Sequence, residues 1–268
     1  MKIDLLTSGI WQTNTSILSH AGACVVIDPA YFPRELEAIG ATVAALGRAE
    51  AVLFTHGHWD HVMGHSLFPG TPVWVSQALE QSIASGAASV LRYLDDARAF
   101  DSRWYVPRPA GYRWPETLRG IGDGEVVHPG GIRMRGLHLP GHSPDGLGLI
   151  VEELHLLIAG DYLSPCEIPF VDDLHAYRET IARLVGLLDG EVRDVVPGHG
   201  RRLTAADALA IARADLEYLD RLADAAARRD PEVARAIVLP RAADAAGMRE
   251  HHLENCAAAG LLIQGPAG

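Results

Sequence analysis

Cysteine is scarce in this chain of 268 residues, which contains three, Cys24, Cys166 and Cys256. They lie far apart and are odd in number, so they form no disulfide framework, and no Cys-x-x-Cys spacing indicates a structural zinc site. No uninterrupted apolar run approaches the roughly 20 residues that a membrane-spanning helix requires. The first residues also lack the apolar stretch and cleavage site of a secretory signal. These absences predict a soluble, cytoplasmic protein without a membrane partner.

Clusters of basic residues are missing as well. The chain carries 23 basic and 34 acidic residues, which gives a net charge of −11 with histidine neutral. Proteins that bind nucleic acids rely on clustered Lys and Arg facing the phosphates, so this charge balance argues against a nucleic-acid partner. Hydrophobic residues make up 48% of the chain and charged residues 21%, as in a globular protein that buries a sizeable core. We therefore expect a small-molecule substrate.

The order of apolar runs and turn signals predicts alternating strands and helices. Residues 17–29 are predicted to form a hairpin around Ala21-Gly22-Ala23, and residues 147–159 a second hairpin that turns at Glu152-Glu153. Further strands are predicted at 51–54, 72–75, 131–134, 136–139 and 194–196, and helices at about 32–46, from 76 onward and at 175–188.

Two regions carry no motif. Residues 86–118 are less regular and hold several aromatic residues among Arg, Pro and Gly. This stretch is interpreted either as a lid over an apolar acyl group or as a surface insertion that packs on the core. The last 60 residues have helical periodicity and would line the cleft or brace the core or a homodimer. We predict one domain over residues 1–268, with a core of about 1–205 and a helical extension over 206–268.

A dense group of metal-ligand residues follows the predicted strand 51–54. His56, His58, Asp60 and His61 lie within six positions. Imidazole and carboxylate groups suit zinc, and also iron or manganese. The His-x-His spacing places both rings on one side of an extended segment, and the adjacent Asp-His pair can face a second position. The loop therefore predicts contributions to two metal sites, neither of which it completes alone.

Three later residues have the setting that the missing ligands need. His142, Asp161 and His199 each follow an apolar strand and a glycine. Taken singly, such a histidine is more often an ordinary loop residue, and such an aspartate a turn or helix cap. Loops of one kind at the ends of four strands indicate that these residues converge on the histidine cluster.

Together these motifs resemble those of the metallo-β-lactamase superfamily. Residues 55–64 match its signature at every motif position, and residues 140–143, 160–161 and 197–200 resemble its later motifs in the same order. The resemblance covers about residues 1–205. It implies an α/β fold, a four-layer αββα sandwich with the metals at one edge of the two sheets, followed here by the helical C-terminal extension.

The resemblance also implies two divalent metal ions, zinc in the first place and iron or manganese as alternatives. By motif position, the first metal is held by His56, His58 and His142, the second by Asp60, His61 and His199, and both by Asp161. Such a centre makes hydroxide available near neutral pH, because metal binding can lower the pKa of water to ~7. The hydroxide would attack a carbonyl or phosphoryl centre, and Asp60 is the candidate residue to orient it or to relay its proton.

The ligand set narrows the substrate class. It resembles the set of hydroxyacylglutathione hydrolases and acyl-homoserine lactonases, which implies hydrolysis of an ester, thioester or lactone. True β-lactamases usually lack a residue equivalent to Asp161, and the oxygen-reducing diiron enzymes typically have Glu where His58 stands. The lactonases have a tyrosine a few residues beyond the bridging aspartate, whereas Tyr162 is directly adjacent to Asp161 here.

Three alternatives stay open on the sequence alone. A persulfide-dioxygenase-like enzyme would hold a single iron with His56, His142 and Asp161. A regulatory member would keep the fold without turnover, and degraded ligands would be expected there. A small-substrate phosphodiesterase or phosphotriesterase would use the same hydroxide.

Overall fold

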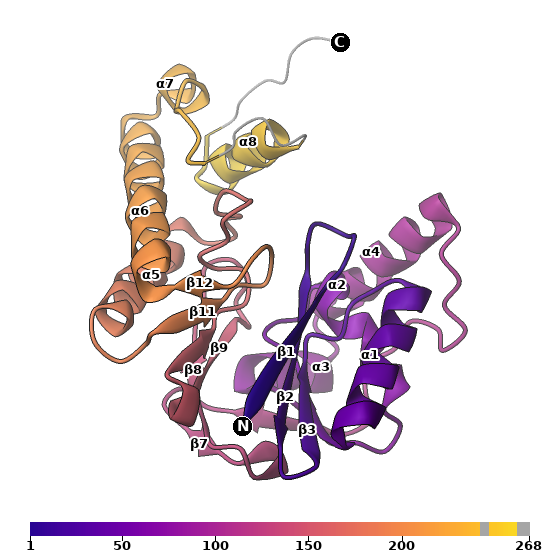
Figure 1. Ribbon diagram of the computed structural model, residues 1–268. Coiled ribbons are helices and arrows are strands. Elements are labelled where there is room, and N and C mark those ends of the chain that lie inside the picture. The colour runs from indigo at the N-terminus through magenta and orange to yellow at the C-terminus, as the bar shows by residue number, and fades with distance from the viewer. Residues whose placement is uncertain (242–246, 262–268) are drawn as a thin grey trace. The chain divides into compact units, whose positions relative to one another are not determined.

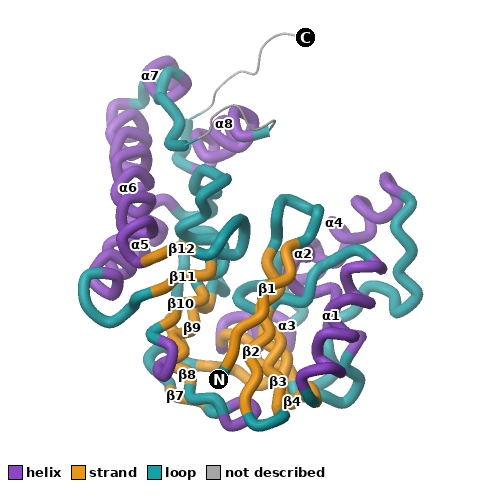
Figure 2. Tube along the Cα trace, in the orientation of Figure 1, coloured by secondary structure: helices purple, strands orange, loops and turns teal. Residues whose placement is uncertain are grey.

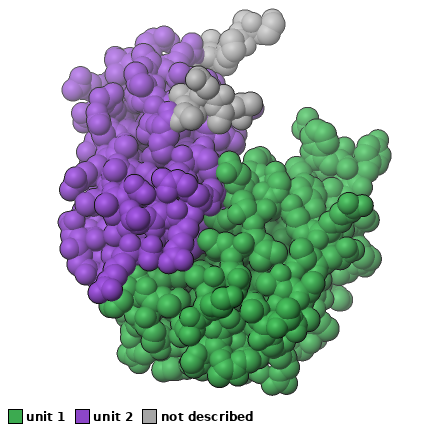
Figure 3. Space-filling view, in the orientation of Figure 1, with its two compact units in different colours: residues 1–138, 145–160 green, residues 139–144, 161–268 purple. Residues whose placement is uncertain are grey.

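The chain folds into two compact units that alternate along the sequence. The computed structural model describes residues 1–241 and 247–261 (Figure 1). The first unit comprises residues 1–138 and 145–160, and the second comprises 139–144 and the residues from 161 onward (Figure 3). The prediction of one domain over the whole chain stays a prediction.

The first unit contains a mixed six-stranded sheet whose strand order follows the sequence. Its strands are β1 (Lys2–Thr7), β2 (Asn14–His20), β3 (Ala23–Ile27), β4 (Arg48–Leu53), β5 (Val73–Ser76) and β6 (Leu118–Ile121). The first three strands are antiparallel and the rest run parallel to β3. Ser19 pairs with Cys24, and the turn between them uses positive φ angles at Ala21 and Gly22, which confirms the first predicted hairpin.

Helices connect the parallel strands of this sheet, as parallel pairing requires. They are α1 (Pro33–Leu46), α2 (Trp59–Val62), α3 (Gln77–Ser85) and α4 (Ala88–Trp104), with a 3-10 turn η1 (Met63–Leu67) after α2. The helix predicted at about 32–46 is therefore confirmed. The Ser76 hydroxyl caps α3 by accepting a hydrogen bond from the backbone N–H of Leu79.

The interpretation of residues 86–118 as irregular was wrong for their first half, which is the helix α4. Val90, Tyr93, Leu94, Ala97 and Asp101 are buried on one face of this helix at spacings of three and four residues. The sequence did not predict this helix because two of its five buried positions, Ala97 and Asp101, are not large apolar residues, so the apolar stripe is incomplete.

A second group of strands in the first unit is antiparallel throughout. It contains β7 (Val126–Val127), β8 (Met134–His138), β9 (Leu147–Val151) and β10 (Leu156–Ile158), with 3-10 turns η2 (Pro129–Gly131) and η3 (Glu152–Leu154). The predicted hairpin that turns at Glu152-Glu153 is confirmed. The two strands predicted at 131–134 and 136–139 are the single strand β8, which begins late because Gly130 and Gly131 take positive φ angles in η2.

The second unit is mostly helical (Figure 2). It contains α5 (Leu174–Leu188), the antiparallel pair β11 (Asp194–Val196) and β12 (Leu203–Thr204), α6 (Ala205–Arg228), α7 (Pro231–Arg235) and α8 (Met248–Ala258). The long helix α6 packs against α5 and both strands. The helical character predicted beyond residue 205 is confirmed for the residues described. Within that part of the chain, no helix is long and apolar enough to cross a membrane.

The end of β4 is buried in the hydrophobic core of the first unit. Ile17, Val26 and Ile39 belong to a cluster between α1 and the strands β2 and β3. Phe54, the residue after β4, is fully buried in a second cluster that includes Tyr93 of α4. The loop that begins at Thr55 therefore starts from a rigid support.

Candidate metal centre

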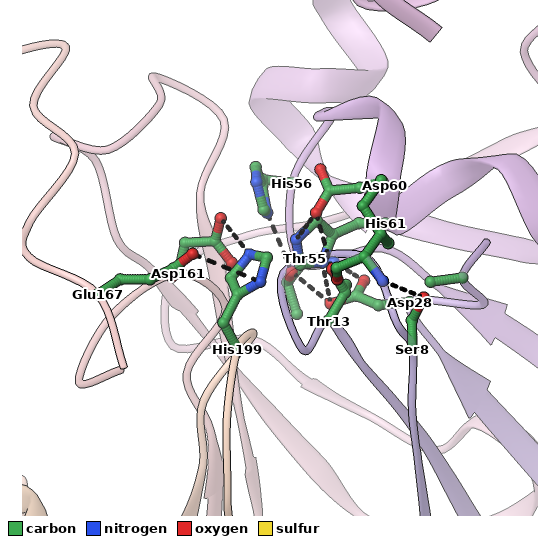
Figure 4. A network of polar contacts seen from close by, with 12 residues as sticks. Ser8, Thr13, Asp28, Thr55, His56, Asp60, His61, Asp161, Glu167 and His199 are labelled. Carbon is green, nitrogen blue, oxygen red and sulfur yellow. Dashed lines mark hydrogen bonds and ion pairs between the residues drawn. The ribbon is translucent and has the colours of Figure 1, made fainter. Parts of the chain in front are cut away.

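In the first unit, the loop after β4 gathers its four ligand-type residues in a small space, and Figure 4 labels three of them, His56, Asp60 and His61. The ring centroid of His56 lies 4.6 Å from that of His58 and 4.3 Å from that of His61. The Asp60 Oδ2 atom lies 3.3 Å from His61 Nε2. His56, Asp60 and His61 are buried, and His58 is half-buried. The sequence-predicted cluster thus forms locally, without residues from the second unit.

Asp28, which belongs to none of the sequence motifs, organises this loop. Its Oδ1 accepts a hydrogen bond from the Thr55 backbone N–H over 2.8 Å, and its Oδ2 accepts one from the Thr55 hydroxyl over 2.6 Å. Oδ2 also lies 3.0 Å from His61 Nδ1. With a proton on Nδ1 shared with this carboxylate, the Nε2 lone pair of His61 is available to a cation. In the sequence, Asp28 stands near the end of the second run of the first predicted hairpin.

Asp145 holds the same loop from another side. The backbone N–H of Gly57 donates to Asp145 Oδ2 over 3.0 Å, and the Ser76 hydroxyl donates to the Asp145 carbonyl oxygen over 2.7 Å. A β-carbon at Gly57 would lie 2.8 Å from Asp145 Oδ2 and 2.8 Å from the ring of Tyr93. Only glycine fits at this position, so the middle residue of the His-x-His sequence is fixed by packing.

In the second unit, Asp161 lies between two histidines. Its Oδ2 is 3.2 Å from His142 Nε2 and 3.3 Å from His199 Nε2. All three side chains are largely withdrawn from solvent. The three residues predicted from separate strand-end loops are therefore brought together within one unit.

Each of these histidines is oriented through its other ring nitrogen. His142 Nδ1 lies 3.1 Å from the Phe170 carbonyl oxygen, and His199 Nδ1 lies 3.8 Å from Glu167 Oε1. The backbone N–H of His142 donates to the hydroxyl of buried Tyr162 over 2.9 Å. Tyr162 thus supports the loop that carries His142.

The donor set fits divalent transition metals. Imidazoles whose Nδ1 faces a carboxylate, carbonyl or hydroxyl, next to buried carboxylates, form the arrangement in which proteins hold zinc or iron. His56 adds a further case, because its Nδ1 lies 3.2 Å from the Thr55 hydroxyl. His65, another histidine close to the cluster, contacts the Val62 carbonyl oxygen through Nδ1 at 2.9 Å, and burial lowers the pKa of its ring.

The family assignment follows from the motifs and this geometry. The profile of the metallo-beta-lactamase superfamily matches residues 8–199, which include all seven predicted ligands. The chain belongs to this superfamily. The resemblance stated from the sequence is therefore confirmed.

Two curated relatives of this superfamily member are named for hydrolysis of thioesters or related acyl compounds. The atrochrysone carboxyl ACP thioesterase of Aspergillus fumigatus is 26% identical over 191 residues, which are 70% of this chain and 50% of that protein. Hydroxyacylglutathione hydrolase GloC of Haemophilus influenzae is 26% identical over 223 residues, 76% of this chain and 93% of that protein. The superfamily member thus spans about half the length of the first relative and most of the second.

Solved structures with the same architecture include two named proteins. TTHA1429, a metallo-beta-lactamase family protein of Thermus thermophilus, has a TM-score of 0.66 at 20% identity and covers 96% of this chain and 91% of its own. TTHA1623, solved in a di-iron-bound form, has a TM-score of 0.55 at 27% identity and covers 76% of this chain and 95% of its own. These likenesses confirm the predicted αββα fold with a helical C-terminal extension.

Proposed function

We propose that this chain is a dinuclear metal-dependent hydrolase that cleaves an ester, thioester or lactone of a small molecule. The observation that carries the proposal is the position of Asp161, whose Oδ2 lies between His142 Nε2 and His199 Nε2. A carboxylate oxygen close to two imidazole nitrogens supports the proposed bridging role. A mononuclear iron site would not need His199.

The proposal assigns the seven residues to two metals. The first metal takes His56, His58 and His142, the second takes Asp60, His61 and His199, and Asp161 contacts both. The proposal thus takes ligands both from the loop after β4 and from the three later strand-end loops. The superfamily profile, which runs through both sets, supports this assignment. TTHA1623, known in a di-iron-bound form, supports two metals, and we propose zinc with iron or manganese as alternatives.

The chemistry divides between the metals and the chain. When bound, the ions supply Lewis acidity and hydroxide near neutral pH. Asp60 is the proposed residue that orients the attacking oxygen or accepts its proton, and its Oδ2 is held by a hydrogen bond from the Thr13 hydroxyl over 3.0 Å. Asp28 keeps the His61 ring in one orientation through the 3.0 Å contact to Nδ1. The buried setting strengthens these charge interactions.

Thioesters are the first substrate class to test. Both named relatives act on acyl groups by their names, one as an ACP thioesterase and one as a hydroxyacylglutathione hydrolase. An acyl group presents a carbonyl carbon to the attacking oxygen, and the developing oxyanion is stabilised by nearby positive charge. Esters and lactones share this carbonyl chemistry.

The test is a substrate panel run on protein whose metal content has been measured. Acyl thioesters, lactones, aryl esters and phosphoesters are compared for the wild type, for Asp161→Ala, and for Asp172→Ala as a control at an exposed aspartate of the second unit. We expect two metals and carbonyl hydrolysis for the wild type and the control. Asp161→Ala should lose metal and at least about 100-fold in rate.

Three outcomes would contradict parts of the proposal. Full metal content and full activity in Asp161→Ala would remove the bridging role. One iron per chain with oxygen consumption would replace the hydrolase by an iron oxygenase. A preference for phosphoesters over all carbonyl substrates would change the bond that is cleaved.

A further inference from the structure

An open apolar groove of about 560 Å³ lies in the first unit. It runs between the loop that joins β1 to β2 and the C-terminal end of α4. Its side chains include Ile10, Trp11, Phe32, Phe100, Trp104 and Tyr105. None of the described residues that line it carries a charged side chain, and its volume is that of a small-molecule site.

The exposed aromatic residues of this groove are unusual for a surface. Trp11 is 54% exposed, Trp104 58% and Tyr105 91%. The rings of Trp11 and Trp104 both approach Phe100, with centroid distances of 6.4 Å in each case. Large apolar side chains that remain exposed together in a concave site indicate a place where a ligand removes them from water.

The wall formed by α4 is held in place by a buried ion pair. The Arg108 guanidinium donates to both carboxylate oxygens of Asp101, over 2.5 Å from Nε and 3.2 Å from Nη2. The hydroxyls of Tyr31 and Tyr112 donate to the same carboxylate over 2.7 Å and 3.0 Å. The segment that returns from Tyr105 is therefore tied to the helix, and the groove is formed before a ligand arrives.

The groove is connected to the metal-ligand loop within the same unit. The ring of Trp59, which stands between His58 and Asp60, lies 5.2 Å from the ring of Trp11 and 4.8 Å from that of Phe100. Thr13, from the same loop as Trp11, donates to Asp60 Oδ2. The lining of the groove thus packs against Trp59, the sequence neighbour of Asp60, to which we assign a role in catalysis.

We propose that this groove binds the hydrocarbon tail of the substrate's acyl group. The protein would then hydrolyse medium- or long-chain acyl compounds. The inference rests on the proposed function for the reaction, but the groove is a property of the first unit alone. An uncharged aromatic lining offers nothing to bind a phosphate or a carboxylate, and it gains free energy from every methylene it covers. The packing of Trp11 and Phe100 on Trp59, beside Asp60, favours a substrate over a second copy of the protein.

Chain length gives a direct measurement. Full burial of one methylene contributes about 0.8 kcal/mol, which is a factor of about four in affinity. Because the groove is open, we expect each methylene to raise the affinity about two- to fourfold. With the metal-loaded protein and butyryl-, hexanoyl-, octanoyl- and decanoyl-CoA, KM should fall by about this factor for each added methylene while kcat changes little. Trp104→Ala and Trp11→Ala should flatten this dependence. Leu91→Ala, at an exposed position of α4 outside the groove, should keep it.

Binding of decanoate to the same metal-loaded proteins, followed by calorimetry, separates this inference from the reaction. Decanoate binding that weakens in Trp104→Ala but not in Leu91→Ala supports the groove even if no thioester is hydrolysed, and in that case only the proposed function fails. The same chain-length dependence in Trp11→Ala, Trp104→Ala and Leu91→Ala overturns the groove while the hydrolase stands. A dimer that Trp104→Ala converts to a monomer, with the chain-length dependence unchanged, also overturns it, because a second copy would then cover the surface.

Discussion

The hydroxyl of Tyr162 lies 2.9 Å from the backbone nitrogen of His142 and accepts its hydrogen bond. The same hydroxyl lies 3.0 Å from the Leu139 carbonyl oxygen and 2.8 Å from that of Pro140. Because Tyr162 directly follows Asp161, one buried phenol joins two loops that carry proposed metal ligands. Tyr162 directly follows Asp161, unlike the tyrosine of the lactonases, and this position lets its hydroxyl reach the His142 loop.

Removal of this hydroxyl should loosen the two loops. In Tyr162→Phe, the His142 N–H loses its acceptor, and the Leu139 and Pro140 carbonyl oxygens lose the one phenolic proton that they share. Each group left unsatisfied costs about 1–3 kcal/mol. We expect a lower unfolding midpoint and about 10- to 100-fold weaker metal binding, as for other residues that support metal ligands. Metal retained after dialysis against a chelator measures the effect. Tyr112→Phe, which removes a hydroxyl from Asp101 in the first unit, is the control and should keep its metals.

Asp28→Asn tests the support of His61. The substitution keeps the shape of the side chain but removes the carboxylate that accepts a hydrogen bond from His61 Nδ1. The tautomer of the ring is then no longer fixed. We expect about 10- to 100-fold weaker binding of the second metal, with the first less affected. Competition with a coloured chelator measures both affinities. Asp96→Asn, at an exposed position of the same unit, should match the wild type, and an equal result for Asp28→Asn would remove Asp28 from the site.

Asn255 of α8 supports His142 from the C-terminal extension. Its Oδ1 accepts from the Val171 N–H over 2.8 Å and its Nδ2 donates to the Pro169 carbonyl oxygen over 2.6 Å, so it holds both sides of Phe170. The Phe170 carbonyl oxygen in turn contacts His142 Nδ1.

Asn255→Ala should therefore reduce metal content as well as stability. Loss of these buried hydrogen bonds costs about 1–3 kcal/mol for each unsatisfied group. The control is Tyr218→Phe, which removes the hydroxyl that also accepts from Asn255 Nδ2 and leaves the bonds beside Phe170 intact. If both variants lose stability equally and neither loses metal, Asn255 braces the helix without reaching the site.

His252 should make stability depend on pH. Burial is the main cause that lowers the pKa of this histidine below 6.5, with a smaller contribution from the charge of Arg249 and an opposing one from the Ala234 carbonyl. The unfolded chain therefore takes up a proton at a higher pH than the folded chain, so stability is full above pH 6.5 and falls as the pH drops below it. Urea midpoints at about pH 7.5 and about pH 5 measure this loss. His252→Asn should show a smaller difference between the two pH values, and an unchanged difference would assign the loss to other groups.

The candidate ligands could be selected from the sequence because their signals are local. Each candidate follows an apolar strand and stands near a glycine, and four of them are packed into residues 56–61. The two hairpins were predictable for a similar reason, since their turn residues and apolar runs are adjacent in the sequence.

The residues that contact the candidate ligands could not be predicted, because tertiary pairing alone selects them. Asp28 stands 33 positions before His61, and Asp145 stands 88 positions after Gly57. Nothing in a single sequence distinguishes such an aspartate from a turn residue. Helix α4 was missed although its pattern is local, because buried Asp101 breaks the apolar stripe that would have marked it.

Gly57 sets a limit on how this protein can diversify. Because Asp145 and Tyr93 fill the space where a side chain at position 57 would begin, this position of the loop after β4 has almost no freedom to change. Trp104 and Tyr105, by contrast, are largely exposed and can be exchanged with little disturbance to packed neighbours. Directed evolution toward new substrates should therefore accumulate its changes at the end of α4 and leave the ligand loop untouched, so that selectivity and reactivity can be altered separately.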